Sequence, residues 1–477
     1  MALELHTTYS EWRSAYAWPS FLREDGLTPP PERLLQAIWF HQRLRRDQLC
    51  TTDGRRLQVL HPGFWNREAG PDFKRAILQW PGETAREGDI EIDLHPSGWR
   101  SHGHASNPGY ANVILHVIWK SNGRETFPTL ELAGQLETSV EKLEHWHNSE
   151  RAARWPTELA GQCRMPLRAL SSDEQLTLLR EAATTRFHVK AARMALRASA
   201  VGWDQTLWEF VFRALGYKQN IWPMQRLGEL VPSFWSSGDS SETLLAKLLG
   251  IAGLLPPSQP IESTPWADYQ RRLLREWEGA RTQLEEHALP RSLWHLHHLR
   301  PANHPQRRLA LASHWLSRSD LSQRVQQWIH NAPPKPRDLC SSLRDSLEIP
   351  RDSLWERHWT FRAASFEGSR PLLGDARLSD IAMNVFLPWV WGRVGTGPSG
   401  QTREEVERRY FAWPQAQDNA TLKLARDRLL SGDRNKCSLR KAAMQQGLLQ
   451  IVSDFCEHSD ALCRQCPFPG WVDEWRS

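Results

Sequence analysis

Long apolar stretches are missing from this chain of 477 residues. No run of about eighteen apolar residues occurs, so the sequence offers no candidate for a membrane-spanning helix. The first residues, Met1 to His6, lack the basic segment and following apolar segment that are typical of a secretory signal peptide. We therefore expect a cytoplasmic protein that has no membrane partner.

Cysteine, lysine and tyrosine are also scarce. The 7 Cys residues are too few for a disulfide framework in a chain of this length. Arg outnumbers Lys about five to one, and no block of Lys and Arg resembles a nucleic-acid-binding arm. With a formal net charge of +5, the composition permits nucleic-acid binding without requiring it. The 25 Trp residues, against 6 Tyr, indicate mainly anchors in cores and interfaces.

The periodicity of apolar residues changes along the chain. A helical pattern follows Pro31, and strand patterns follow at residues 55–60, 72–80, 88–95, 113–120 and 127–132. From about Ser171 onward the patterns are helical, and a Pro-rich segment at 332–336 separates a further module. We predict an α+β protein with a mixed α/β domain at residues 1–165, a helical domain at 166–332 and a helical C-terminal module at 333–477.

Two neighbouring strand patterns carry a candidate metal site. In residues 88–95, Glu91, Asp93 and His95 alternate with aliphatic residues, and the period of two in a strand places these polar side chains on one face. Asp72 follows a Gly-Pro pair at the start of the preceding strand. Carboxylate oxygens suit Mg²⁺ or Mn²⁺, so we predict that Asp72, Glu91 and Asp93 bind such an ion.

A sheet face that points to water shows the same alternation, and this alternative stays open. The density of histidines favours a site, because His95, His102 and His104 lie close to the carboxylates in sequence. His116 stands inside an apolar segment, and we expect it to be a buried, hydrogen-bonded core residue.

Several motifs are found in order along the chain, at residues 32–39, 66–73, 102–104, 110–117, 300–305 and 384–388, and in the C-terminal Cys motif. Together they look like the motifs of the bacterial domain-of-unknown-function 2851 family. The resemblance spans nearly the whole chain. It implies membership of that family and no particular reaction.

The N-terminal domain also resembles the PD-(D/E)xK nuclease superfamily, whose core is a helix bearing a Glu, a three-stranded meander bearing the Asp and the (D/E)-x-K, and a further strand. Glu32, Asp72 and Glu91 stand at the matching positions. Asp93 replaces the Lys, so Lys74 would have to supply a cation, and His95, His102 or His104 would act as the base. The resemblance implies phosphodiester hydrolysis at a Mg²⁺ site, with nucleic acid as the substrate. For Glu32, a plain carboxylate at a helix N-terminus is the alternative.

Four cysteines near the C-terminus form a second candidate site. Cys456, Cys463 and Cys466 follow Cys437 in a spacing that favours a Zn²⁺ ion or a [4Fe–4S] cluster. The last three are similar to the cluster loop of helix-hairpin-helix DNA glycosylases, except that the fourth Cys of that loop is missing and Cys437 would replace it. Ordinary unliganded thiols are the alternative.

Two functions therefore remain open at this level. One is a divalent-metal-dependent nuclease, and the other is a non-catalytic nucleic-acid-binding or scaffolding protein with a degenerate nuclease fold. Hydrolysis of another substrate at a His-rich metal site is a third.

Overall fold

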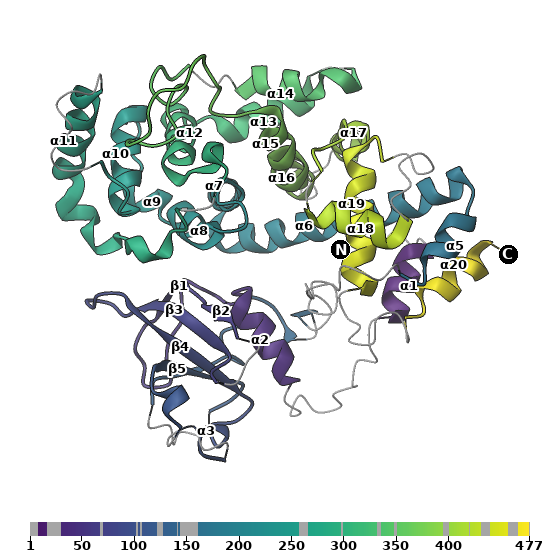
Figure 1. Cartoon of the computed structure of the whole chain (residues 1–477), viewed down its shortest axis with the longest axis horizontal. Helices are drawn as coiled ribbons and strands as arrows, with labels where there is room; N and C mark the ends of the chain where they lie inside the picture. Colours follow the sequence, from purple (N-terminus) through teal and green to yellow (C-terminus); the bar gives the residue numbers. More distant parts are fainter. Residues whose placement is uncertain are drawn as a thin grey trace. The chain divides into compact units, whose positions relative to one another are not determined.

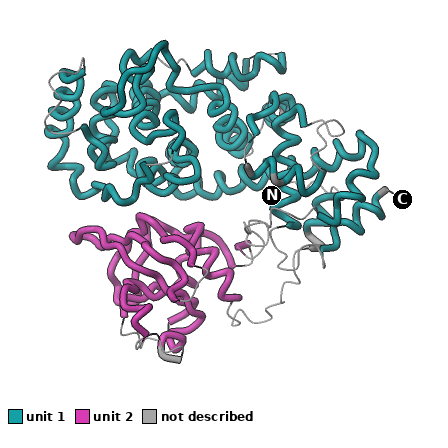
Figure 2. The backbone as a smooth tube through the Cα atoms, in the orientation of Figure 1, with its two compact units in different colours: residues 1–14, 154–477 teal, residues 15–153 magenta. Residues whose placement is uncertain are grey.

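The computed structural model describes most of the chain. The residues that it describes are 8–16, 30–66, 70–101, 104, 107–121, 127–140, 142–143, 161–256, 266–296, 299–331, 335–347, 351–394, 400–418, 420–430, 439–456 and 466–476. The chain forms two compact units (Figure 2). We call residues 15–153 the sheet unit, and residues 1–14 with 154–477 the helical unit.

The described residues of the sheet unit form helix α2, a six-stranded sheet and short helical turns. Its elements are α2 (Glu32–Phe40), β1 (Gln58–His61), β2 (Phe64–Trp65), β3 (Phe73–Gln79), β4 (Arg86–Asp93), α3 (Gly98–Ser101), η2 (Pro108–Tyr110), β5 (Val113–Ile118) and β6 (Thr129–Glu131).

The sheet is mixed, with the strand order β1-β3-β4-β5-β6 and β2 paired to β3 (Figure 1). The strands β1, β3 and β4 form an antiparallel meander, whereas β5 lies parallel to β4 and β6 parallel to β5. Residues 94–112 make the connection that a parallel pair requires. The β3–β4 ladder shifts register between Phe73 and Ala76, where Arg75 has a φ of +59°.

Helix α2 and the sheet share one hydrophobic core. Pro31 at the N-cap lacks the N–H that would be unsatisfied there, and the apolar residues of α2 recur at helical spacing. Its buried Leu34, Ile38 and Trp39 pack in one cluster with Ile90 and Ile92 of β4. The Trp39 indole N–H donates to the Pro62 carbonyl at 2.8 Å, which fixes the ring against the loop after β1. This core occupies the aliphatic face of β4 and leaves the acidic face for the candidate site.

The helical unit is built from helices throughout its described part. They are α1 (Thr8–Tyr16), α5 (Arg164–Ala169), α6 (Ser172–Val201), α7 (Trp203–Leu215), α8 (Ile221–Glu229), α9 (Val231–Phe234), α10 (Ser241–Ile251), α11 (Ala267–Leu284), α12 (Pro305–Arg318), α13 (Leu321–His330), α14 (Leu339–Leu347), α15 (Asp375–Ile381), α16 (Leu387–Val394), α17 (Gly400–Ala412), α18 (Ala420–Leu430), α19 (Ala442–Ile451) and α20 (Phe468–Arg476). Two π-helical segments, η7 (Ala382–Phe386) and η8 (Val452–Cys456), continue α15 and α19.

The 30-residue helix α6 runs through the helical unit (Figure 1). A capping box starts it, because the Ser171 hydroxyl accepts from the Glu174 N–H and the Glu174 carboxylate accepts from the Ser171 N–H. Helix α19 packs closely on α6 at Gly447, where an added Cβ would lie 2.1 Å from the Leu179 carbonyl oxygen. The two ends of the chain also meet, since Tyr9 of α1 donates to Asp454 at 2.8 Å.

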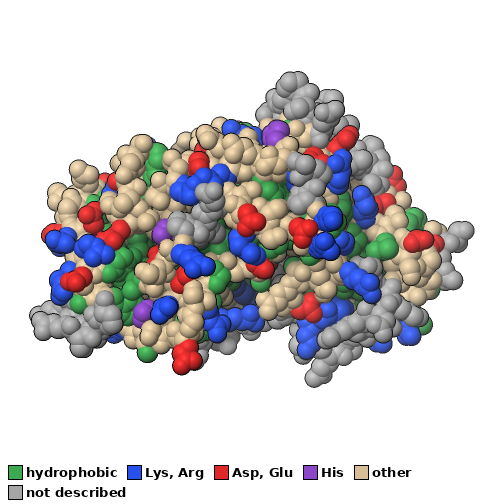
Figure 3. Space-filling view, turned by 90° about the horizontal axis from the view of Figure 1, so that it is seen from above, with side chains coloured by type: hydrophobic (Ala, Val, Ile, Leu, Met, Phe, Trp, Pro, Cys, Tyr) green, Lys and Arg blue, Asp and Glu red, His purple; other side chains and the backbone are tan. Residues whose placement is uncertain are grey.

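The α+β fold class predicted from the sequence is confirmed, with the strands in the N-terminal part and helices after it. In the sequence, the boundary between the sheet unit and the rest of the helical unit lies near residue 154. The further domain boundary predicted between residues 332 and 333 stays a prediction. Among the described residues, none of the helices has the length and apolar character needed to cross a bilayer. Over the described part of the face shown in Figure 3, Lys and Arg side chains are interspersed with Asp and Glu.

Candidate metal centre

The C-terminal half of β4 delivers Glu91 and Asp93 to the same side of the sheet. Ile90 and Ile92 alternate with them and enter the core, so both carboxylates lie on the opposite face. This face is covered as well, because Glu91 is 6% exposed and Asp93 3% exposed. Burial on this scale argues against the solvated-face alternative for these two carboxylates, since Asp and Glu are rarely buried without partners.

Asp72 joins the two carboxylates from the neighbouring strand. It precedes Phe73, which pairs with Ile90, so Asp72 lies beside Glu91. Its backbone N–H donates to Glu91 Oε2 at 3.2 Å, and its own Oδ2 accepts from the Ile92 N–H at 3.0 Å. These two hydrogen bonds fix the carboxylates of Asp72 and Glu91 relative to each other.

Helix α2 contributes a fourth carboxylate through Gln36. The Gln36 side-chain amide donates to Asp72 Oδ1 at 2.9 Å and to Glu32 Oε1 at 3.2 Å. Gln36 is therefore a functional candidate that the sequence patterns missed. The sequence does contain a pattern that could have identified Gln36: it follows Glu32 by four residues, and residues four apart share a helix face.

Two histidines complete the centre. His104 Nε2 lies 3.1 Å from Glu91 Oε1, and His116 Nε2 lies 2.9 Å from Asp93 Oδ2. One ligand atom each of Glu91, Asp93 and His104 can be chosen so that all three lie within 4.8 Å of one another. This spacing suits ligands that share one cation.

The segment after β4 closes over this centre. An added Cβ on Gly98 would lie 2.3 Å from Asp93 Oδ1, so only glycine permits this approach. The rings of His104 and Tyr110 stack with centroids 3.9 Å apart, and Trp99 packs against His104 and His116 at 5.5 Å from each. The aromatic residues thus exclude water from one side of the carboxylate cluster.

The electrostatics of the cluster favour a bound cation. Burial raises the pKa of Asp72 to about 7, and repulsion from Glu32 and Asp93 adds to this effect. Burial raises the pKa of Glu91 to about 8, again with repulsion from Asp72, Asp93 and Glu32. Burial also raises the pKa of Tyr110, and the nearby charges of Glu91, Asp72 and Asp93 raise it further. A cation placed among them would relieve this repulsion.

Comparison with known protein families gives a match over most of the chain. A family model described as "Protein of unknown function (DUF2851)" matches residues 32–408. The chain belongs to the DUF2851 family. The match begins at Glu32 of the candidate centre and includes all of its residues. No curated protein and no solved structure gives a significant match.

Other predicted site residues of this DUF2851 chain lie apart from the cluster or outside the description. His95 is exposed, because β4 ends at Asp93 and the chain turns there. Lys74 is exposed and pairs with Phe64 of the short strand β2, and within the described residues no ion pair joins it to the carboxylates. His102 lies outside the described residues, while its neighbour His104 is in the cluster.

The C-terminal cysteines are described only in part. Cys456 ends the π-helical segment η8, and the Cys466 thiol lies 3.9 Å from the Phe455 carbonyl oxygen. Cys437 and Cys463 lie outside the described residues. All four stand beyond Arg408, where the DUF2851 match ends.

Proposed function

We propose that this DUF2851 protein is a divalent-metal-dependent hydrolase of phosphodiester bonds, with nucleic acid as its substrate class. The observation that carries the proposal is the buried group of Glu91, Asp93 and His104, with partly buried Asp72 hydrogen-bonded to Glu91. In this cluster the pKa values of Asp72 and Glu91 are raised. Perturbed acids of this kind concentrate at functional sites.

The donor set fits Mg²⁺ or Mn²⁺. Glu91 and Asp93, together with Asp72 beside Glu91, offer the hard oxygen ligands that these ions prefer. When bound, such an ion would lower the pKa of a coordinated water and offset negative charge that develops on a phosphate. Asp72, Glu91 and Asp93 are the residues that would hold it.

The neighbouring residues have roles that follow from their contacts. Gln36 orients Asp72, and the backbone N–H groups of Asp72 and Ile92 hold the carboxylates in place. His104, against Glu91, is the residue placed to accept a proton from an attacking water. His116 holds Asp93, which replaces the Lys expected from the superfamily resemblance.

The order of elements supports the same proposal. A helix that carries Glu32, an antiparallel meander that carries Asp72 and Glu91, and a parallel strand next to the meander follow each other as in the PD-(D/E)xK superfamily. The catalytic step would then be in-line attack of water on phosphorus, which releases one alcohol oxygen of the diester.

A cleavage assay on the full-length chain tests the proposal. Labelled single-stranded DNA, double-stranded DNA and RNA are incubated with Mg²⁺, Mn²⁺ or EDTA. We expect metal-dependent cleavage by the parent and by Glu87→Gln, whose side chain is exposed on the same strand, and no cleavage by Glu91→Gln. Equal activity of Glu91→Gln and the parent would reject the mechanism.

A second function is favoured by one observation. Asp93 stands where the superfamily has Lys, and exposed Lys74 forms no ion pair with the cluster among the described residues. A non-catalytic nucleic-acid-binding or scaffolding protein would keep metal binding and lose cleavage. Calorimetric binding of Mn²⁺ by the parent that Glu91→Gln abolishes, together with no cleavage of any substrate, would support this alternative.

We further propose that Cys437, Cys456, Cys463 and Cys466 hold Zn²⁺ or a [4Fe–4S] cluster. The support is their sequence spacing, together with a reducing compartment as the expected setting. Anaerobic purification with metal analysis and an absorption spectrum tests this. Absence of both Zn and Fe, with four thiols open to alkylation, would reject it.

A further inference from the structure

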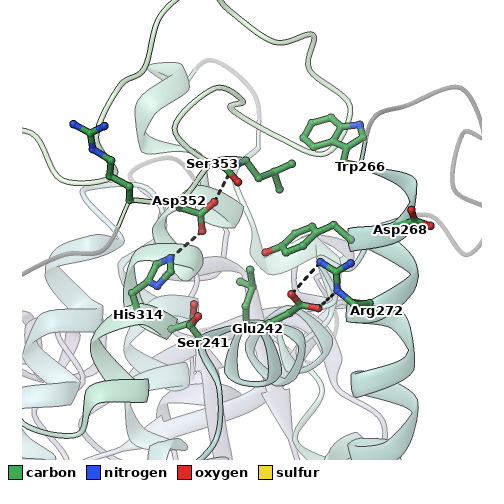
Figure 4. Close-up of a pocket in the computed structure, with 13 residues that line it drawn as sticks. Ser241, Glu242, Trp266, Asp268, Arg272, His314, Asp352 and Ser353 are labelled. Carbon is green, nitrogen blue, oxygen red and sulfur yellow. Dashed lines mark hydrogen bonds and ion pairs between the residues drawn. The ribbon is translucent and has the colours of Figure 1, made fainter.

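The helical unit contains a pocket that the candidate metal centre does not use. Its volume is about 420 Å³, within the range of about 300–1,000 Å³ that is usual for small-molecule sites. The first turns of α10 and α11, the second half of α12 and the loop at residues 351–354 form its walls (Figure 4). These segments are far apart in sequence, so the pocket is a product of the tertiary fold.

One wall carries a histidine that contacts a partly buried carboxylate. His314 Nε2 lies 2.8 Å from Asp352 Oδ2, and Asp352 Oδ1 accepts from the backbone N–H groups of Leu354 and Trp355 at 3.1 and 2.9 Å. Burial would raise the pKa of Asp352, but these hydrogen bonds outweigh burial and lower it. Asp352 is therefore a carboxylate at neutral pH and can only accept.

The contact with Asp352 fixes which ring nitrogen of His314 carries the proton in the neutral tautomer. Its Nε2 must donate to Asp352, so in the neutral ring Nδ1 carries a lone pair. Within the described residues, Nδ1 makes no hydrogen bond. The fold thus presents an oriented acceptor at the pocket wall, which a hydroxyl group of a ligand would satisfy.

Hydroxyl groups surround the same space. Ser241 and Ser353 line the pocket, and their side chains make no hydrogen bond to any described residue. Tyr269 is mostly buried, and its oxygen accepts from the Trp355 indole N–H at 3.2 Å, which leaves its proton available to donate. Figure 4 shows Ser241 on the same side of the pocket as His314 and Asp352.

The pocket lining has no excess of positive charge, because three carboxylates stand beside two Arg residues. Glu242 and Arg272 form two contacts with each other, at 2.6 and 3.3 Å. Of the other two carboxylates, Asp352 contacts His314, and Asp268 pairs with Arg271 at 2.6 Å. Phosphate recognition requires an excess of Arg or Lys, and this lining has none among the described residues.

The aromatic residues offer little area for stacking. Trp266 is 6% exposed, and the centroid of His358 lies 3.7 Å from its ring. The ring of Tyr269 is covered by Arg272, whose guanidinium carbon lies 5.6 Å from the centroid. A nucleobase would need an open ring face, whereas hydroxyl groups need only edges and polar atoms.

We propose that this pocket binds a small, uncharged, polyhydroxylated ligand of the sugar class, with His314 as the acceptor and Ser241, Ser353 and Tyr269 as hydroxyl partners. The ligand hydroxyls would replace water at polar groups that make no hydrogen bond to any residue that the structure describes. This binding is independent of the metal centre in the sheet unit.

Ligand-observed saturation-transfer NMR on the full-length chain tests the proposal. The probes are D-ribose, N-acetyl-D-glucosamine and methyl β-D-glucopyranoside, with adenosine and inorganic phosphate as competing classes. We expect saturation of the ring protons of at least one sugar. Binding by adenosine or phosphate alone, or by none of the probes, would overturn the proposal.

Variants then locate the binding. His314→Gln keeps a donor to Asp352 and removes Nδ1, while Ser241→Ala and Ser353→Ala each remove one hydroxyl. Each should weaken sugar binding roughly twofold to tenfold, the effect of one hydrogen bond, and Ser236→Ala, exposed before α10, should not. If His314→Gln unfolds the chain, the two serine variants decide. Unchanged affinity in both would overturn the assignment.

Discussion

Histidine and carboxylate meet in both units, but with opposite electrostatics. In the sheet unit, burial and mutual repulsion raise the pKa values of Asp72 and Glu91. In the helical unit, hydrogen bonds lower the pKa of Asp352 and hold His314. In the first arrangement the carboxylates repel one another, whereas in the second the carboxylate is stabilised by its hydrogen bonds. The comparison teaches that the same two residue types differ in electrostatics according to how many carboxylates are buried together and how many hydrogen bonds each accepts.

The largest expected effect is loss of metal binding when one carboxylate is neutralised. Glu91→Gln should weaken Mn²⁺ binding by at least about a hundredfold, since changes to the outer partners of metal ligands alone cost about 10–100-fold. Isothermal titration calorimetry measures this, with Glu87→Gln as the exposed control on the same strand. If both variants bind as the parent does, the cluster is not the metal centre.

Gly98→Ala should also weaken Mn²⁺ binding strongly, because the new Cβ would displace Asp93. The matched control is Gly134→Ala, since an added Cβ there meets nothing within 4 Å. The same calorimetric titration compares the two variants. Equal affinity in both would show that the position of Asp93 is unimportant for binding.

Asn substitutions should have opposite effects on the stability of the two units. At pH 8, Asp72→Asn removes a repelled negative charge and should slow amide hydrogen exchange in β4 of the metal-free protein. Asp352→Asn removes a stabilised charge and should speed exchange in α12, with a cost of about 1.5–3 kcal/mol for a charged hydrogen bond. Hydrogen exchange with mass spectrometry reads both segments in one experiment. A change of the exchange rate in the same direction in β4 and in α12 would contradict the comparison.

The raised pKa values of Asp72 and Glu91 also predict how the stability of the metal-free protein depends on pH. Asp72 and Glu91 have folded pKa values above their ordinary ones, so their contribution to stability is present below about pH 4 and is lost as the pH rises through about 7 and 8. The metal-free protein should therefore melt at a lower temperature at pH 8.5 than at pH 6. Mn²⁺ should raise the melting temperature more at pH 8.5, where no proton has to be displaced. Thermal melts of the parent and Glu91→Gln check this.

The smallest effect is expected at Gln36. Gln36→Leu keeps the helix and removes the two hydrogen bonds to Asp72 and Glu32, so metal affinity should fall by about tenfold, the lower end for an outer partner. Titration with Mn²⁺ measures the change. An unaltered affinity would show that Asp72 needs no support from α2.

The sequence by itself determined the local parts of this protein. The period of two in residues 88–95 separated Glu91 and Asp93 from Ile90 and Ile92, and the Pro residues before Glu32 indicated the start of α2. The α+β class and the DUF2851 membership also followed from sequence patterns. These features depend on neighbours along the chain, which periodicity records.

Only the tertiary structure decided which residues meet. The parallel pairing of β4 with β5 sets His116 opposite Glu91 and within reach of Asp93, and the connection between these strands brings His104 to Glu91. The end of β4 at Asp93 leaves His95 exposed. The pair of His314 and Asp352 joins a helix to a loop that no sequence pattern linked to it. Strand register, chain crossovers and burial set these contacts and their pKa values, and a one-dimensional pattern contains none of the three.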